Sequence, residues 1–429
     1  MKVYFVTFGC KVNQYESQAM MQLLERHGYQ TAEWNAAIRA EEELAVVVNS
    51  CTVTAESDRK LRQMLRRIRR NCPQAVVVLT GCFVQAFADK AQQLDMVDIV
   101  LGNAQRSLLP QLLQQYQASP QRLVHIPKHT AAYEPLMVHR FEGRTRAFVK
   151  IEDGCDRFCS YCIIPYARGR VRSLPLPLLT EQVECLARQG FREVVLVGIN
   201  LTAYGKDIGC NIADAVEAAC AVEGIERVRL GSLEPDHVTD EVIRRLAACR
   251  QLCPQFHIAL QSGCDATLKR MKRRYTAAQY EQLCSALRKA FPACTLTTDI
   301  MVGFPGETQQ DFECSMQFCQ KIGFARMHVF AYSRRSGTLA DVMPDQVAEN
   351  EKALRAKQMG KLAQALAEQA AQAVVGQTVQ VLAETKIQEG RCEGYTDTYL
   401  PVQFSCDCEA GQMCTVRIIG QQNGICIGE

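Results

Sequence analysis

Short apolar, β-branched runs alternate with helical patterns along most of this 429-residue chain. Three early runs have the near-continuous apolar content of buried parallel strands: Val3–Thr7, Leu44–Asn49 and Ala75–Thr80. Helical patterns follow them at Gln14–His27, Ala55–Arg70 and Gln85–Leu94. This rhythm is typical of an open, doubly wound α/β sheet. We predict such a domain over residues 1–115, followed by a proline-containing linker to about Arg140.

A second α/β series begins near Phe141. Six strands are expected, with helices between them: Arg146–Glu152, Glu193–Gly198, Arg227–Gly231, His257–Leu260, Leu296–Val302 and Met327–Tyr332. The repeats predict a partial (β/α)6 barrel over residues 141–372, closed by a long helix. The remaining residues, 373–429, form short strand-like pieces broken by glycines, which predicts a small β-barrel.

The bulk composition excludes several classes of protein. No apolar run approaches the roughly 20 residues that span a bilayer, and the N-terminus turns polar too early for a secretory signal. We therefore expect a cytoplasmic protein without membrane contact. The 22 cysteines are then not expected to form disulfides, because that compartment keeps thiols reduced. They indicate metal or cluster chemistry together with buried thiols that pack as small apolar side chains.

One cysteine run has the spacing of a cluster loop. Cys155, Cys159 and Cys162 lie in GCDRFCSYCIIPYARGRVRS, separated by three residues and then by two. Three thiolates on one loop can hold three corners of a cubic iron–sulfur cluster and leave its fourth iron open to a substrate. A zinc site is the alternative, but zinc usually takes a second cysteine pair or nearby histidines, and this loop has neither.

Three further cysteines share one structural position, since each follows a predicted strand. They are Cys10, Cys51 and Cys82. Loops at the carboxyl ends of parallel strands converge on one crevice, so these thiols predict a second cluster site. The alternative is three buried cysteines at strand ends. A last group in the tail, at positions 406, 408 and 414, shows no fourth ligand in the sequence, and we do not predict a metal site there.

Polar residues mark the carboxyl ends of most predicted barrel strands, which is the face where barrel active sites lie. Many could instead be turn residues chosen for backbone geometry. The expected cofactor-contacting ring is Gly198, Asn200, Ser232, Glu234, Gln261, Ser262, Gly303 and Tyr332. Two basic clusters could contact RNA phosphates, although such runs are usually solvated faces. The candidates there are Arg62, Arg66, Arg69, Arg70, Lys272 and Arg273.

The cysteine loop resembles that of radical S-adenosylmethionine (SAM) enzymes of the methylthiotransferase group. The resemblance continues through LVGINLTAYG, GSLEPDH, HIALQSGCDATLKRMKRRYT, TDIMVGFPGET and HVFAYSRRSGTLA. In the tail, GYTDTYLPV resembles the RNA-binding barrel of TRAM type that ends these enzymes, although Thr398 stands where asparagine is expected and the tail is acidic. GCKVNQYES is similar to the branch that modifies threonylcarbamoyladenosine in tRNA, and this assignment depends largely on Lys11 and Val12.

The resemblance implies two [4Fe–4S] clusters, one on each cysteine set, with SAM as radical source and methyl donor. The implied reaction adds a methylthio group to C2 of N6-threonylcarbamoyladenosine at position 37. A radical is needed because C2 carries no acidic hydrogen, and no catalytic side chain is assigned beyond the cluster ligands. Expected partners are the tRNA anticodon loop and an electron donor of flavodoxin or ferredoxin type, and we expect a monomer.

Alternatives remain open at this stage. The same chemistry could act on isopentenyladenosine-37 tRNA or on a ribosomal protein. From other classes, the chain could be an iron–sulfur electron-transfer or cluster-delivery protein, or an RNA-binding protein with structural zinc.

Overall fold

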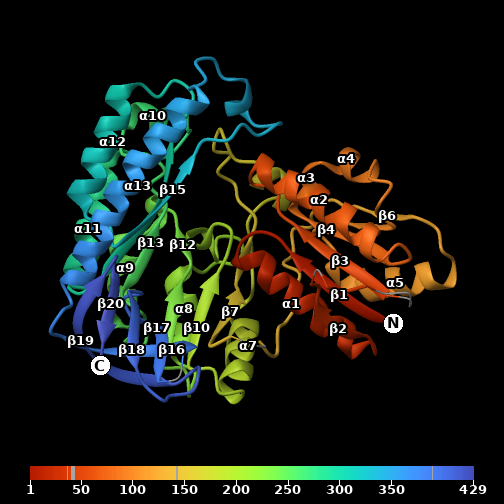
Figure 1. The fold of residues 1–429 in the computed structure, drawn as a ribbon, viewed down its shortest axis with the longest axis horizontal. Coiled ribbons are helices and arrows are strands. Elements are labelled where there is room, and N and C mark those ends of the chain that lie inside the picture. The colour runs from red at the N-terminus through yellow and green to blue at the C-terminus, as the bar shows by residue number, and fades with distance from the viewer. Residues whose placement is uncertain (36, 40–43, 142–143, 389) are drawn as a thin grey trace.

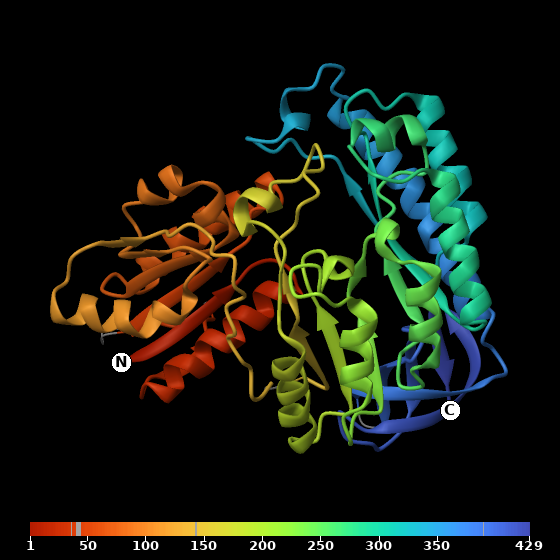
Figure 2. The ribbon, with the colours of Figure 1, turned by 180° about the vertical axis from the view of Figure 1, so that it is seen from behind.

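The computed structural model describes residues 1–35, 37–39, 44–141, 144–388 and 390–429. An N-terminal sheet lies to one side of a central curved set of strands, and a small barrel lies below those strands (Figure 1). The view from behind shows the same three parts, with both chain ends on the outside of the molecule (Figure 2). Within the described residues, no helix has the length and apolar character needed to cross a membrane.

The N-terminal region is a six-stranded parallel sheet in the order β2-β1-β3-β4-β5-β6. Its strands are β1 (Lys2–Thr7), β2 (Gln30–Glu33), β3 (Leu44–Ser50), β4 (Val76–Gly81), β5 (Ile99–Leu101) and β6 (Leu123–His125). Its helices are α1 (Lys11–Arg26), α2 (Ala55–Asn71), α3 (Cys82–Ala86), α4 (Ala88–Gln92), η1 (Arg106–Leu108) and α5 (Leu109–Ala118).

Apolar cores on both faces make this sheet doubly wound. Leu61 and Leu65 of α2 pack on one face, and Met20 of α1 with Leu113 of α5 packs on the other. The three predicted strands correspond to β1, β3 and β4. The predicted linker is wrong in one respect, because β6 lies inside it and pairs with β5. Strands of three or four residues are too short to give a periodic signal.

The central region is a half-barrel of two parallel sheets, β7-β10-β11 and β12-β13-β14-β15. Only Gly231 separates β11 from β12. The strands are β7 (Arg146–Lys150), β10 (Glu193–Val197), β11 (Arg227–Leu230), β12 (Ser232–Leu233), β13 (Gln255–Ile258), β14 (Thr295–Val302) and β15 (Arg326–Ala331). β8 (Glu152–Asp153) and β9 (Arg172–Ser173) form a separate antiparallel pair.

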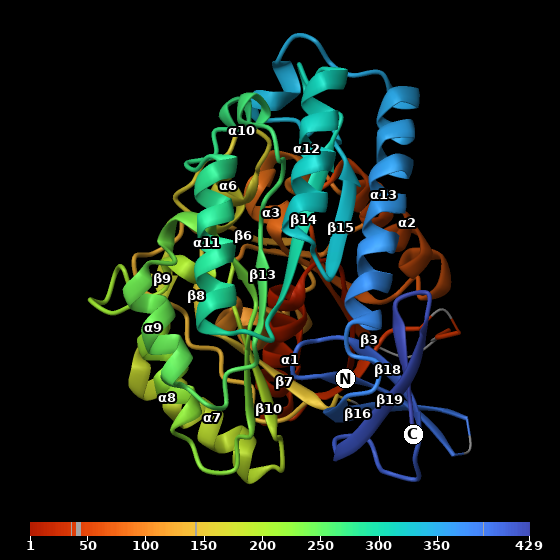
Figure 3. The same ribbon diagram turned by 90° about the vertical axis from the view of Figure 1, so that its left-hand side faces the viewer.

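Helices cover the outer face of this half-barrel, and α11, α12 and α13 stand side by side outside β13, β14 and β15 (Figure 3). The helices are α6 (Ile164–Arg168), α7 (Leu176–Arg188), η2 (Leu201–Ala203), α8 (Ile212–Cys220), η3 (Pro235–His237), α9 (Asp240–Ala248), α10 (Asp265–Arg270), α11 (Ala277–Ala290), α12 (Gln309–Ile322), η4 (Leu339–Val342) and α13 (Glu349–Gln372). The predicted partial (β/α)6 barrel is therefore confirmed as a fold.

The tail forms a closed barrel in the order β16-β17-β18-β20-β19. Its strands are β16 (Thr378–Gln388), β17 (Arg391–Thr396), β18 (Pro401–Ser405), β19 (Met413–Gln422) and β20 (Ile425–Gly428). Arginines of β11 join it to the half-barrel: Arg227 donates to the Gln380 carbonyl (2.8 Å), and Arg229 donates to the Asp397 carbonyl (2.8 Å). The predicted small barrel is thus confirmed, and it docks on the half-barrel through β11.

Candidate functional site

The cluster loop lies between β8 and α6, just beyond the carboxyl end of β7. The Cys155 N–H donates to the Gly169 carbonyl (2.9 Å), and the Cys162 N–H donates to the Cys159 carbonyl (3.0 Å). Burial raises the pKa of Cys155 and of Cys162 to about 12, and the Cys159 thiol contributes to both rises. The three thiols are therefore close enough to influence one another's charge, and the loop that carries them is partly shielded from water. A bound cation would stabilise their thiolates, so this donor set fits an iron–sulfur cluster.

Arg273 links this loop to the barrel mouth. Its guanidinium donates to the Cys159 sulfur (3.4 Å), to the Ala259 carbonyl (3.1 Å) and to the Glu234 carboxylate. The Arg273 side chain is 3% exposed. Our assignment of Arg273 to RNA contact is therefore wrong, because its charge is used beside the cysteine loop. Nothing in the pattern of the basic run indicated that one of its arginines would turn inward.

The second set of cysteines converges because β1, β3 and β4 are adjacent in the sheet. Cys51 and Cys82 follow β3 and β4 directly, and Cys10 comes three residues after the end of β1. Gly9 has a φ of 109°, and a Cβ placed on it would lie 2.9 Å from the Cys51 Cβ, so the first two loops touch. Burial raises the pKa of Cys51 to about 11, and Cys82 and Cys10 add to that rise. Three clustered thiols at one crevice fit a second cluster.

A buried ion network joins the two cysteine sites. The Arg168 guanidinium, which is 1% exposed, donates to Glu16 (2.7 Å) and Asn13 (3.0 Å) of α1 and to Asp153 (3.0 Å) beside the barrel loop. Asn13 accepts from the Cys10 thiol (3.5 Å) and donates to the Ser50 carbonyl (3.1 Å). Arg168 therefore spans from the end of the barrel loop to the N-terminal crevice and fixes the two sites relative to each other.

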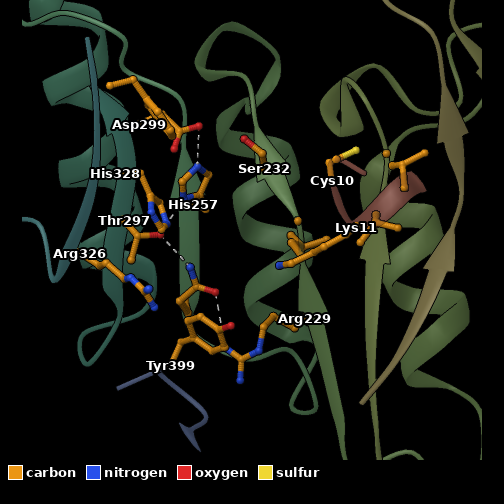
Figure 4. Close-up of a pocket in the computed structure, with 18 residues that line it drawn as sticks. Cys10, Lys11, Arg229, Ser232, His257, Thr297, Asp299, Arg326, His328 and Tyr399 are labelled. Atoms are coloured by element: carbon orange, nitrogen blue, oxygen red, sulfur yellow. Dashed lines mark hydrogen bonds and ion pairs between the residues drawn. The ribbon is translucent and has the colours of Figure 1, made fainter. Parts of the chain in front are cut away.

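A cavity of about 660 Å³ opens between Cys10 and the inner face of the half-barrel. Cys10 and Ser232 lie at its upper side and Tyr399 of the small barrel lies at its lower side (Figure 4). Three cations line it: Lys11, Arg229 and Arg326. Burial alone would raise the pKa of Tyr399, but Arg146, Lys11 and Arg229 outweigh it and lower that pKa. Because Arg229 is paired with Glu193 (2.8 Å) and Arg146 with Glu384 (2.6 Å), the positive charge of the cavity comes mainly from Lys11 and Arg326.

His257 and His328 line the wall of the cavity that faces Cys10 and Lys11 (Figure 4). His257 accepts or donates one hydrogen bond with Thr297 (3.0 Å) and lies 3.3 Å from the Asp299 carboxylate. Burial lowers the pKa of His328, and the charges of Arg326 and Lys11 lower it too. His257, His328, Arg229 and Arg326 were not among the site residues predicted from the sequence. They lie within strands or, for Arg326, at the start of β15, and only the alternation of inward side chains along β11, β13 and β15 could have indicated them.

The predicted ring residues all lie at or just beyond the carboxyl ends of barrel strands. The N–H groups of Ile199 and Asn200 both donate to Glu152 (2.7 Å each), which holds the loop after β10. Ser262 is fully buried after β13. Gly303 and Tyr332 follow β14 and β15.

Tyr332, one of these residues, has a polar group that makes no hydrogen bond to the described residues. The Tyr332 hydroxyl is buried and has no hydrogen-bond partner among the described residues. Its ring packs on Phe304, which packs on Tyr161 of the cluster loop. Phe304 therefore lies between Tyr332 and Tyr161 of the cluster loop. A buried hydroxyl placed there fits a ligand with several polar groups, such as SAM. Contacts between the ring residues and SAM stay a prediction.

The basic candidates divide into two groups. Arg62, Arg66 and Arg70 are exposed along α2, and Lys272 is exposed after α10. Arg69 differs from these, because its guanidinium donates to the Met96 and Ala75 carbonyls and pairs with Asp98 (2.6 Å). Its charge holds α2 against the sheet, so we withdraw Arg69 from the RNA-contact set.

Comparison with known proteins agrees with this architecture. A family model of the radical SAM superfamily matches residues 149–319, and the model of the uncharacterized protein family UPF0004 matches residues 2–102. A threonylcarbamoyladenosine tRNA methylthiotransferase of Thermotoga maritima is 37% identical over 96% of this chain and 93% of its own length. A protein of the same name from Bacillus subtilis is 38% identical over 94% and 90%. The chain belongs to the radical SAM methylthiotransferase family.

Other matches mark the range of this family. A tRNA-2-methylthio-N(6)-dimethylallyladenosine synthase of Pelotomaculum thermopropionicum is 35% identical over 91% of this chain and 88% of its own. Among solved structures, the radical SAM methyltransferase TsrM of Kitasatospora setae has a TM-score of 0.60 at 15% identity and covers 80% of this chain and 77% of that one, a likeness of fold alone. Membership implies that this methylthiotransferase uses a [4Fe–4S] cluster and SAM.

Proposed function

We propose that this methylthiotransferase adds a methylthio group to C2 of N6-threonylcarbamoyladenosine at position 37 of tRNA. The observation that carries the proposal is the positive cavity beside Cys10. The threonylcarbamoyl group ends in a carboxylate, whereas an isopentenyl group is uncharged. Lys11 and Arg326 offer a carboxylate charge-assisted hydrogen bonds, whereas Arg229 already pairs with Glu193 (2.8 Å). An isopentenyl chain would leave the same cations desolvated and unpaired, which is costly.

Lys11 is the cation of this set that comes from the cysteine crevice. It is the residue after Cys10, and the protein around it lowers its pKa by desolvation, with Arg146 and Arg229 adding to the effect. An anion bound in the cavity would relieve that repulsion. Lys11 therefore couples recognition of the carboxylate to the position of the base beside Cys10.

The proposed cofactors are two [4Fe–4S] clusters and SAM. When bound, the cluster and SAM supply the 5′-deoxyadenosyl radical, and the second cluster serves sulfur transfer. Cys155, Cys159 and Cys162 would hold the first cluster, and Cys10, Cys51 and Cys82 would hold the second. The residues of this chain do the remaining work. Arg273 orients the Cys159 sulfur, Arg168 fixes the two sites relative to each other, and the cavity walls shield the base from water.

The tRNA would approach across the exposed arginines of α2. Arg335, in the loop after β15, pairs with Asp58 of α2 (2.7 Å) and so holds that helix beside the barrel mouth. We infer that the basic face and the cavity contact different parts of the same anticodon loop. An anticodon loop presents exposed bases, so the backbone can lie on Arg62, Arg66 and Arg70 while the target base enters the cavity.

The charge of Lys11 gives a direct test. Lys11→Gln should lower kcat/KM for threonylcarbamoyl tRNA by about 10- to 100-fold, since a hydrogen bond to a charged group contributes about 1.5–3 kcal/mol. Formation of 5′-deoxyadenosine without tRNA should not change. Lys289→Gln, on the exposed side of α11, is the matched control and should behave as wild type. Equal wild-type activity on isopentenyladenosine tRNA would contradict the proposal.

Two measurements distinguish the proposed function from the alternative substrates and from the other classes of protein. In cells that lack the protein and any paralogue, mass spectrometry of tRNA nucleosides should show the methylthio group missing from threonylcarbamoyladenosine only. With purified protein, SAM should change the spectrum of the reduced cluster and yield 5′-deoxyadenosine. An electron-transfer or cluster-delivery protein would show neither change.

A further inference from the structure

Three sulfurs meet at one end of the small C-terminal barrel. Cys406 and Cys408 lie between β18 and β19, and Cys414 lies in β19. The Cys414 sulfur is 3.0 Å from the Cys408 sulfur and 4.0 Å from the Cys406 sulfur, and all three lie within 4.8 Å of one another. The Cys408 N–H donates to the Cys406 sulfur (3.1 Å), which turns both side chains to the same side of the loop.

This spacing matches a tetrahedral thiolate site. With Zn–S bonds of about 2.3 Å, the sulfurs of such a site lie about 3.8 Å apart. The observed separations bracket that value. Soft thiolate ligands favour zinc over harder cations, and the three side chains are half-buried rather than flexible on the surface. An iron–sulfur cube would need its sulfur ligands farther apart than this group holds them.

A fourth sulfur lies beneath the same loop. Cys392 of β17 is 1% exposed, and its sulfur lies 3.4 Å from the Cys406 carbonyl and 3.9 Å from the Cys408 carbonyl. Nothing in the linear sequence marks Cys392 as a partner of this group, because the strand pairing of β17 with β18 brings it there. The barrel therefore brings a fourth thiol beneath the loop, outside the group of three sulfurs that lie within 4.8 Å of one another and directed at the Cys406 and Cys408 carbonyls.

We propose that Cys406, Cys408 and Cys414 bind a structural zinc ion, and that Cys392 becomes the fourth ligand when its thiol turns from the carbonyls that it contacts. The site is separate from both cysteine sets of the catalytic region. Its role follows from the size of the barrel, since a domain of about 50 residues has a small core and commonly needs a metal or disulfide for stability. Zinc would close the loop from β18 to β19 and hold the barrel whose Tyr399 lines the cavity.

The test uses the full chain, purified anaerobically with both clusters reconstituted. Metal analysis should find about one zinc per chain, and zinc K-edge absorption should show a shell of sulfur only, at about 2.3 Å. The double variant Cys408→Ser/Cys414→Ser should lose the zinc and keep its iron. Cys284→Ser, at a buried cysteine of α11, is the matched control and should keep both metals. Cys392→Ser should replace one sulfur of the shell with a lighter atom.

A second measurement needs no variant, so it also covers a double variant that fails to fold. In wild type, added zinc should protect Cys406, Cys408 and Cys414 from alkylation, and a chelator should expose them. Three outcomes would overturn the proposal: no zinc bound after stoichiometric addition under reductant, zinc retained by the folded double variant, or a Cys408–Cys414 disulfide in the anaerobically prepared protein.

Discussion

The two cysteine sites of the catalytic region are built in opposite ways. One takes its three thiols from a single loop of eight residues, Cys155–Cys162, and the other takes one thiol from each of three strand ends. The first is local, so its geometry depends on that loop and on Arg273 beside it. The second exists only when β1, β3 and β4 pair in register. The loop site should therefore tolerate changes in the N-terminal sheet, whereas the strand-end site should not tolerate changes in its own sheet.

The largest expected effect separates the chemistry of the two sites. Cys159→Ala should abolish 5′-deoxyadenosine formation, because the loop cluster loses a ligand. Cys51→Ala should stop methylthiolation while part of the 5′-deoxyadenosine formation remains. The measurement is chromatography of the deoxynucleoside together with mass spectrometry of the tRNA product. Cys319→Ala, at a buried packing cysteine of α12, is the control and should retain both activities. Equal loss of both activities in the two variants would refute the division of labour.

The same contrast explains why both cysteine sites could be predicted from the sequence and the cavity could not. The spacing of Cys155, Cys159 and Cys162 is visible directly, and the strand-end position of the other three cysteines could be inferred because long β-branched runs mark β1, β3 and β4. The cavity was missed, since Arg229 lies within β11 and Arg326 begins β15, and the inward direction of both side chains depends on how the half-barrel curves. Tyr399 was also missed as a cavity residue. Its place depends on how the tail barrel docks, and no local pattern encodes docking.

Glycines next to the cysteines sharpen the comparison. Gly9→Ala would place a Cβ 2.9 Å from the Cys51 Cβ, and Gly154→Ala would place one in a harder clash with the Arg170 carbonyl oxygen. We expect each variant to lose about four of about eight irons per chain, the first from the strand-end site and the second from the loop site. Only Gly154→Ala should remove 5′-deoxyadenosine formation. Anaerobic iron and sulfide counting checks the loss.

Backbone strain alone needs a separate control. Gly190→Ala has a similar φ of 88° but nothing within 4 Å of the added carbon, so it carries strain of about 1–3 kcal/mol without a clash. It should lower the melting temperature and keep all the iron. If Gly190→Ala lost as much iron as Gly9→Ala, contact between the two cysteine loops would not be the cause.

Glu16→Gln tests the network that joins the two sites. The variant leaves Arg168 and Lys150 buried with an uncharged partner, which should lower the free energy of unfolding by about 3–5 kcal/mol. Burial would raise the pKa of Glu16, but Arg106, Arg168 and Lys150 lower it to about 2. A lowered acid pKa stabilises the fold above the unfolded value of 4.5 and loses that effect as pH falls toward 2.

The difference in stability between wild type and Glu16→Gln should therefore be constant from pH 8 to about pH 5 and should narrow below it. Urea unfolding at several pH values measures this difference. Glu281→Gln removes an exposed pair with Lys321 and should cost less than about 1 kcal/mol at every pH. A gap between wild type and Glu16→Gln that stayed constant down to pH 3 would exclude a lowered pKa at Glu16.

The smallest expected effect compares the surfaces of the two regions that are proposed to contact RNA. Replacing Arg62, Arg66 and Arg70 together with glutamine removes three exposed cations from α2, and Lys272→Gln removes one beside the barrel mouth. A plot of the logarithm of the tRNA binding constant against the logarithm of the salt concentration has a negative slope, which scales with the number of phosphates that the protein neutralises. We expect this slope to become shallower by about 2 for the triple variant and by about 0.7 for Lys272→Gln. Filter binding over a range of salt concentrations measures both slopes.

Arg69→Gln is the matched control on the same helix. Its guanidinium is held by Asp98 and two carbonyls, so its loss should lower the stability of the N-terminal sheet and leave the salt slope unchanged. Unchanged slopes in all variants would place the RNA surface away from α2. A larger slope change for Lys272→Gln than for the triple variant would instead move the main contact to the half-barrel. In that case the N-terminal sheet would serve its cysteine site alone.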